Sequence, residues 1–169
     1  MATITKQEVD SYLTFKLGKE EYAANVTTVL NILELTKITH VPKAPEYMKG
    51  IINLRGEVLP VIDTRIKFGM DETRFTDNTC ILVLEIDMDE EPVKVGAIVD
   101  SVQEVLEIGK NQLQAAPSIG KSYKSDFIAG MFLSKEEFIM ILDMERVFSV
   151  SELNELKSSV TSIDTENLN

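Results

Sequence analysis

His40 is the only histidine among the 169 residues and the first candidate for acid–base chemistry. A catalytic histidine needs a carboxylate that orients its ring, and the residues next to His40 supply none. Adjacent glutamates elsewhere fall in predicted turns, where solvated charge is the usual explanation. A histidine in a loop or at a strand edge is therefore the better interpretation, and the sequence predicts no catalytic residues.

Two loops resemble ion-binding motifs but lack essential positions. Residues 120–122 (Gly-Lys-Ser) resemble the end of a phosphate-binding loop, but Ala115 stands where the first glycine is required. The acidic run 87–91 resembles the start of a calcium loop, but Pro92 occupies the position of the essential glycine, and Ile98 that of the last glutamate. The sequence therefore predicts neither a phosphate loop nor a metal site.

Arg55 has a more suggestive setting, because it stands at the tip of a predicted β-hairpin. Two apolar, β-branched runs, Ile51-Ile52 and 58–62, flank the tip. Asn53 and Gly56 tolerate the backbone angles of a tight connection. Most arginines in loops are only solubilising, so spacing alone favours an ordinary hairpin with a solvated arginine.

The elements that position these residues belong to a soluble, acidic chain. Its composition is 44% hydrophobic and 27% charged, and its net charge of −11 makes nucleic acid and anionic lipid poor partners. No apolar run reaches the ~20 residues of a membrane span, and residues 1–10 lack the pattern of a signal peptide. We therefore expect a cytoplasmic protein. Cys80, the lone cysteine, lies in an apolar run and is expected to be a buried structural thiol.

The sequence contains an internal repeat. The pattern Val-x-x-Val-Leu-x-Ile occurs at 26–32 and again at 102–108. In each copy a proline and then a glycine follow, and both halves close on similar segments, 61–68 and 141–148. This ordered series predicts a duplication into two related halves of roughly 75 residues.

Each half is predicted to consist of short strands. Residues 13–17 alternate apolar and polar side chains, and 81–86 with 93–99 predict a second hairpin. A helical turn is expected over 26–33. Two repeats of this size favour two small closed β-barrels packed together, since closure protects strand edges. After Phe148, a serine could cap a short helix, followed by a polar tail.

A larger set of motifs resembles the CheW family of bacterial chemotaxis coupling proteins. The resemblance rests on residues 12–18, 21–23, 37–45, Lys49-Gly50, Asn53-Leu54-Arg55-Gly56, Pro60-Val61-Ile62-Asp63, 65–68, 95–102 and 105–106. It implies a mainly β fold of two tandem SH3-like, five-stranded β-barrel subdomains with short helical segments and a C-terminal helix. We expect a CheW-like domain at 8–150, with barrels at about 8–75 and 76–150 that can exchange strands, followed by the helix and tail at 151–169.

The resemblance also implies partners. The protein would be a non-enzymatic adaptor that joins the regulatory domain of the histidine kinase CheA to the cytoplasmic tips of methyl-accepting chemoreceptors. It would work without cofactors, would not insert into the membrane, and would be recruited to membrane receptor arrays. The alternatives are a coupling protein of a related pathway, controlling twitching or development, and a small-ligand or hydrolytic β-barrel in which His40 acts with a carboxylate.

The family's partner-binding positions carry over to eight residues. They are Val29, Asn31, Ile32, Lys49, Gly50, Arg55, Gly56 and Cys80. The resemblance favours a functional Arg55, whose guanidinium suits a specific carboxylate or carbonyl contact. Val29, Ile32 and Cys80 match positions that line a groove for the receptor hairpin, although barrel core uses the same residue types. Asn31 departs from the glutamate common in the family. The region 133–136 of the second half lacks the Arg55 tip sequence, so the halves are expected to differ in role.

Overall fold

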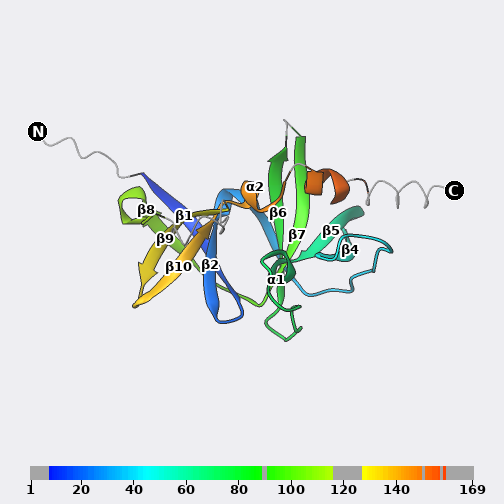
Figure 1. The fold of residues 1–169 in the computed structure, drawn as a ribbon, viewed down its shortest axis with the longest axis horizontal. Helices are drawn as coiled ribbons and strands as arrows, with labels where there is room; N and C mark the ends of the chain where they lie inside the picture. Colours follow the sequence, from blue (N-terminus) through cyan, green and yellow to red (C-terminus); the bar gives the residue numbers. More distant parts are fainter. Residues whose placement is uncertain (1–7, 89–90, 116–126, 150, 157, 159–169) are drawn as a thin grey trace, which may run out of the picture.

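A computed structural model describes residues 8–88, 91–115, 127–149, 151–156 and 158, and these form two β-sheets side by side (Figure 1). The first sheet has the order β8-β1-β2-β10-β9 and contains β1 (Val9–Leu17), β2 (Glu20–Asn25), β8 (Ser101–Gly109), β9 (Ile128–Ser134) and β10 (Glu137–Leu142). The second has the order β3-β6-β7-β5-β4 and contains β3 (Val29–Glu34), β4 (Met48–Leu54), β5 (Glu57–Asp63), β6 (Cys80–Met88) and β7 (Glu91–Val99).

Both sheets close into barrels through the segment that follows an edge strand. After β3, Thr39 exchanges two backbone hydrogen bonds of 2.8 Å with Ile51 in β4, the strand at the opposite edge. After β8, Gln114 pairs in the same way with Met131 in β9. We call the closed first and second sheets barrel 1 and barrel 2. The predicted mainly β fold of two small five-stranded barrels is confirmed.

The repeat is visible as a reciprocal exchange of strands. The hairpin β1–β2 lies in barrel 1, but the next strand, β3, lies in barrel 2. The hairpin β6–β7 lies in barrel 2, and the next strand, β8, returns to barrel 1. Equivalent parallel pairs, β2 with β10 and β5 with β7, join the exchanged parts. Each barrel therefore draws strands from both halves of the sequence, and the chain crosses between barrels at equivalent points.

Short helical segments connect the strands. They are η1 (Val26–Thr28), α1 (Thr64–Lys67), η2 (Lys110–Gln112) and α2 (Met144–Val147). The helical turn expected over 26–33 is present only as η1, which Asn25 caps through a 2.9 Å bond from the Thr27 amide. From Val29 onward the chain pairs with β6, so the apolar spacing of Val29 and Leu33 belongs to a strand.

The largest hydrophobic core lies between the barrels. It joins β1 and β2 residues such as Phe15 to β6 and β7 residues such as Leu84 and Val95, all at most 1% exposed. Smaller cores fill barrel 2, around Ile81, and barrel 1, around Ile141. The barrels are thus held together by buried apolar surface, and grooves at their junction have rigid walls.

A C-terminal helix docks on this inter-barrel core. Residues 151–156 are helical, and Leu153 and Leu156 are at most 2% exposed. Ser149 caps the helix: its hydroxyl accepts from the Glu152 amide at 3.1 Å, and Glu152 accepts from the Ser149 amide at 2.9 Å. The predicted helix start is therefore present, whereas Val160 and the predicted polar tail lie outside the described residues.

Lys67 ties the C-terminal helix to barrel 2. Its ammonium pairs with the Glu152 carboxylate and lies 5.1 Å from the Tyr47 ring centroid and 5.7 Å from that of Phe148. Burial, aided by the negative charges of Glu152 and Glu155, raises the pKa of Tyr47 to about 12. Among the described residues, this corner of the protein is apolar and acidic around Lys67.

Candidate partner-binding surfaces

The predicted hairpin at Arg55 is present. Strands β4 and β5 are joined by Arg55 and Gly56, which have φ angles of 52° and 87°, as a type I′ turn requires. The Asn53 side chain accepts a 2.8 Å hydrogen bond from the Gly56 amide and stabilises the turn. Arg55 is exposed, and among the described residues its guanidinium has no hydrogen-bond or ion-pair partner. The turn thus presents a free cation to solvent.

Arg55 borders a hollow that we call the tip hollow, with a volume of about 310 Å³. Its walls come from the hairpin, from β3 and from the central strands β6 and β7: Leu30, Asn31, Leu54, Arg55, Glu57, Val83 and Lys94. Leu30 is 49% exposed, and Lys94 pairs with Glu57 across 3.2 Å. Two of the predicted residues, Arg55 and Asn31, therefore lie together around an apolar floor with a charged rim, a typical interface composition.

The second half has an equivalent turn with a different sequence. Lys135 and Glu136, between β9 and β10, have φ angles of 50° and 70°, close to those of Arg55 and Gly56. The second half lacks the Asn-Leu-Arg-Gly sequence, as expected, but it keeps the backbone conformation of the turn without asparagine and glycine. What differs is chemistry, since Lys135 is followed by two glutamates.

A second hollow, the inter-barrel groove, contains Cys80 and has a volume of about 560 Å³. It is lined by Glu34 and Leu35 from the end of β3, by residues 76–80, and by Ser101 and Val102 from β8. The Cys80 thiol is half-buried and donates a hydrogen bond of 3.2 Å to the Asn78 carbonyl. Because the walls belong to both barrels, an occupant would contact both at once.

Val29 and Ile32 lie on the same face of β3 as Glu34, and Glu34 lines the inter-barrel groove. Val29 pairs with Leu84, Ile32 with Leu82 and Glu34 with Cys80, so alternation directs these side chains toward the inter-barrel side. Val29 is half-buried against the inter-barrel core, whereas Ile32 is 44% exposed. Ile32 is therefore an exposed apolar side chain beside the groove, and Val29 is largely a packing residue.

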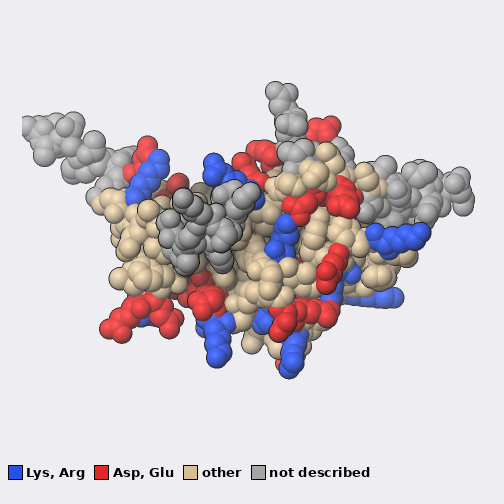
Figure 2. All heavy atoms as spheres, viewed as in Figure 1, with Lys and Arg blue, Asp and Glu red and all other residues tan. Residues whose placement is uncertain are grey.

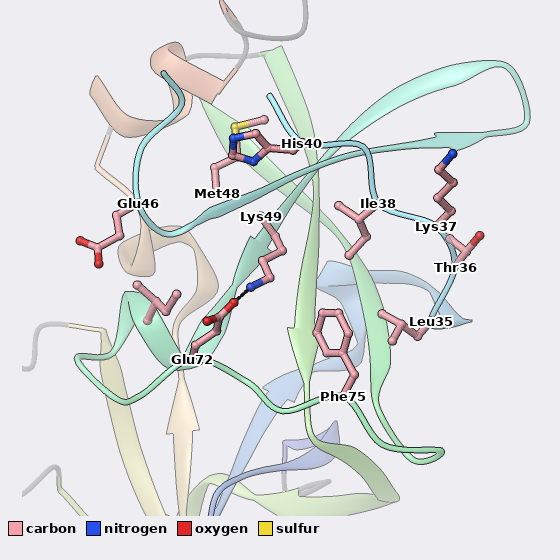
Figure 3. A pocket seen from close by; sticks show the side chains of 11 residues that line it. Leu35, Thr36, Lys37, Ile38, His40, Glu46, Met48, Lys49, Glu72 and Phe75 are labelled. Carbon is pink, nitrogen blue, oxygen red and sulfur yellow. Dashed lines mark ion pairs between the residues drawn. The ribbon is translucent and has the colours of Figure 1, made fainter. Parts of the chain in front are cut away.

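Lys49 lies in a third hollow, the Lys49 pocket, shown in Figure 3, with a volume of about 710 Å³. Its ammonium pairs with the Glu72 carboxylate and lies 5.7 Å from the Phe75 ring centroid. Glu72 and Phe75 come from the loop between α1 and β6, which no sequence pattern singled out. The lysine is thus engaged by its own chain.

Gly50 is buried, in contrast to Arg55 and Gly56. Its φ is +153°, and a Cβ there would lie 2.1 Å from the Thr39 carbonyl oxygen that closes barrel 2. Gly130 in β9 is its counterpart, with a Cβ position 3.0 Å from the Gln114 carbonyl oxygen. The glycine at position 50 is required for barrel closure, so its influence on any surface is exerted through backbone conformation.

His40 also lines the Lys49 pocket but is not assembled with a carboxylate. In Figure 3 Glu46 points away from His40, and Glu72 is turned toward Lys49. Within the described residues no His40–carboxylate hydrogen bond occurs, and no group of three metal-ligating side chains lies together. The two ends of the acidic run at 87–91 pair within the β6–β7 ladder, Asp87 with Pro92 and Met88 with Glu91, and residues 89 and 90 lie outside the described part. In the part of the chain that the structure describes, these arrangements offer surfaces for binding and no assembled reaction centre.

Charge is distributed unevenly over the surface. On the face shown in Figure 2, basic side chains are scattered singly, and acidic side chains gather at the lower left, where Figure 1 places the β9–β10 hairpin.

No helix among the described residues is both long and apolar enough to cross a membrane.

Two tandem SH3-like barrels with exposed, partly apolar hollows offer surfaces that suit the binding of other proteins. Comparison with known proteins identifies the family. A family model described as CheW-like domain matches residues 11–152. The chain is 29% identical over 157 residues to the chemotaxis protein CheW of Klebsiella aerogenes, covering 90% of this chain and 92% of that protein. It is 28% identical to CheW of Treponema pallidum, covering 85% of each chain.

A solved structure agrees with these relatives. The crystal structure of the scaffolding protein TtCheW from Thermoanaerobacter tengcongensis has a TM-score of 0.74 and 30% sequence identity, covering 86% of this chain and 96% of that chain. The chain therefore belongs to the CheW family of chemotaxis proteins. It is a chemotaxis adaptor and not an enzyme, as the resemblance of its motifs implied.

Proposed function

We propose that this adaptor couples the histidine kinase CheA to the cytoplasmic tips of chemoreceptors by holding them at two separate surfaces, one at the hairpin end of barrel 2 and one between the barrels. The observation that carries the proposal is the separation of the tip hollow, at the hairpin end of the barrel, from the inter-barrel groove. The two hollows share no lining residue. Two partners can therefore occupy them at the same time, and the adaptor would be recruited to membrane receptor arrays through the receptor.

The inter-barrel groove is the proposed receptor surface. A receptor tip is a helical hairpin, and a helix-accepting groove needs exposed apolar anchors between firm walls. Ile32 supplies an exposed anchor, while Val29 and the half-buried Cys80 rest on the inter-barrel core beneath it. Contact with both barrels would let the receptor sense or set their arrangement.

The tip hollow is the proposed kinase surface. The regulatory domain of the kinase has the same SH3-like fold in the family, so barrel end can meet barrel end. Leu30 and Leu54 supply apolar contact, and the unpaired Arg55 can donate to a carboxylate or carbonyl. Asn31 lines the tip hollow, and Gly56 completes the turn that carries Arg55. Lys49 and Gly50 lie apart from this surface: the Lys49 pocket shares Leu35 with the inter-barrel groove, and Gly50 acts through the closure of barrel 2.

Calorimetric titration with the kinase regulatory domain, and separately with a receptor-tip hairpin fragment, tests this proposal. We expect the wild-type protein to bind both. Arg55→Ala should weaken binding of the kinase domain about tenfold, the loss typical of a central interface arginine. Because Arg55 does not line the groove, affinity for the receptor fragment should stay within about twofold.

Lys135→Ala is the matched control. It removes a cation from a turn with the same backbone angles at the other hairpin, so it should leave both affinities unchanged. Equal losses in the two variants would mean that net charge, and not position, matters. If Arg55→Ala altered neither affinity, the assignment of Arg55 would be lost, and binding of neither partner by the wild type would overturn the coupling proposal.

A further inference from the structure

Asp63 is a fully buried acidic residue with more hydrogen bonds than its helix-capping role needs. It is 0% exposed, and its Oδ1 accepts from the Arg65 amide at 3.1 Å, which caps α1. The same carboxylate binds Thr73 twice: Oδ1 accepts from the hydroxyl at 2.6 Å, and Oδ2 accepts from the amide at 2.9 Å. Asp63 therefore links the end of β5 to a loop ten residues away.

Asp143 shows what the equivalent residue does in the second half. Asp63 ends β5 and Asp143 directly follows β10. Both cap a four-residue helix and donate a backbone hydrogen bond to an equivalent carbonyl, Tyr47 for Asp63 and Phe127 for Asp143. Asp143 accepts from the Glu145 amide at 3.1 Å, but its side chain is 36% exposed and, within the described residues, has no bond to a distant loop. The Thr73 contact is thus an addition specific to barrel 2.

The loop held by this contact forms a wall of two hollows. Between residues 71 and 79 only Thr73 and Thr79 are buried, at 5% and 3% exposure. Thr79 is bonded locally to Thr76, next to the start of β6. Thr73 is therefore the buried anchor of the first part of the loop, and Lys49 contacts Glu72 and Phe75 on either side of it. On one side Glu72 and Phe75 line the Lys49 pocket, and on the other side residues 76–79 line the inter-barrel groove.

We propose that Asp63 is a positioning residue for the partner surface: its carboxylate clamps Thr73, and this clamp fixes the loop 71–79 that walls the inter-barrel groove and the Lys49 pocket. The inference rests on the proposed function only in assigning the groove to the receptor tip. The clamp acts on the groove and not on the tip hollow, because no residue of the loop lines that hollow.

The substitution Asp63→Asn loses a hydrogen bond of the carboxylate whichever way the amide turns. If the amide oxygen replaces Oδ1, the NH₂ group faces the Thr73 amide, and two donors meet. If the oxygen replaces Oδ2, the NH₂ group faces the Arg65 amide, and the cap of α1 is lost. Thr73→Val is a milder variant that removes only the hydroxyl bond, and Thr73→Ser restores it.

Hydrogen exchange and calorimetry on the full chain test the proposal together. In Thr73→Val, amides of residues 71–79 should exchange about tenfold faster, with the β6–β7 ladder unchanged. Affinity for the receptor-tip fragment should fall about tenfold, affinity for the kinase domain should not change, and Thr73→Ser should behave as wild type. Asp143→Asn, the control, should leave the loop and both affinities unaffected.

Unchanged exchange at 71–79 in Thr73→Val would overturn the clamp, even if Asp63→Asn failed to fold. Equal losses of affinity for both partners would also overturn it, since they would indicate a general weakening of the fold. The exchange measurement needs no partner. A wild-type protein that binds no receptor fragment would therefore count against the proposed function and leave the clamp to be decided by exchange.

Discussion

Replacement of Gly50 by alanine should open barrel 2. An added Cβ would lie 2.1 Å from the Thr39 carbonyl oxygen and 2.8 Å from Cγ2 of Ile38, far inside contact distance. The oxygen belongs to backbone that is itself bonded to Ile51. The segment must therefore move by about 1 Å, and the hydrogen bonds that join it to β4 must break.

The cost follows from the bonds lost and the backbone angle. Two hydrogen bonds of 2.8 Å between Thr39 and Ile51 contribute about 1 kcal/mol each. An L-residue at a φ of +153° adds about 1–3 kcal/mol of strain. We expect Gly50→Ala to lower the free energy of unfolding by about 3–5 kcal/mol, a large share of the stability of a domain this size.

Urea unfolding followed by circular dichroism measures this loss, with two glycines as internal standards. Gly130→Ala should cost less, because its Cβ position is 3.0 Å from the nearest atom, the Gln114 carbonyl oxygen. Gly56→Ala should cost about 1 kcal/mol, since its φ is +87° but no atom lies within 4 Å. A Gly50→Ala protein within about 1 kcal/mol of wild type would refute the closure argument.

Two further predictions concern the docked C-terminal helix. Burial alone would raise the pKa of Glu152, but hydrogen bonds from Lys67 and Ser149 outweigh it and hold the pKa below the ordinary 4.5. The stability from this ion pair is therefore present above pH 4.5 and lost as the pH falls below it. Glu152→Gln should flatten the decline in melting temperature between about pH 6 and pH 3, and an unaltered decline would contradict the assignment. The Tyr47 hydroxyl is buried without a hydrogen-bond partner among the described residues. In urea unfolding, Tyr47→Phe should therefore leave the free energy of unfolding unchanged or raise it by up to about 1 kcal/mol. A loss of more than about 1 kcal/mol would reveal a hydrogen bond at that hydroxyl.

The sequence predicted local elements well, because their signals are local. The β-branched runs around Arg55 and the asparagine and glycine of the tip define a hairpin without reference to the rest of the chain. The repeated Val-x-x-Val-Leu-x-Ile pattern marked β3 and β8 as equivalents, and they are equivalent edge strands of the two barrels. Its apolar spacing fits both a helix and a buried strand, and only pairing with β6 decides between them.

Long-range features could not be predicted in the same way. That Asn31 and Arg55 share a hollow depends on how β3 crosses into barrel 2, and no local pattern encodes this crossing. The apolar residues of the loop 71–79 follow no periodic pattern. The sequence therefore did not predict that this loop lines two hollows or that Asp63 holds it. A strand interpretation of 29–34 would have identified Leu30 and Ile32 as exposed. The eight positions named from the family resemblance remain a prediction.

Simultaneous binding tests the central claim of two separate surfaces most directly. The receptor-tip fragment would be titrated by calorimetry into the protein already saturated with the kinase regulatory domain. Since the tip hollow and the inter-barrel groove share no lining residue, we expect a ternary complex with the receptor affinity unchanged or increased. Displacement of the kinase domain by the receptor fragment would show that the two partners compete for one surface, and would contradict the account.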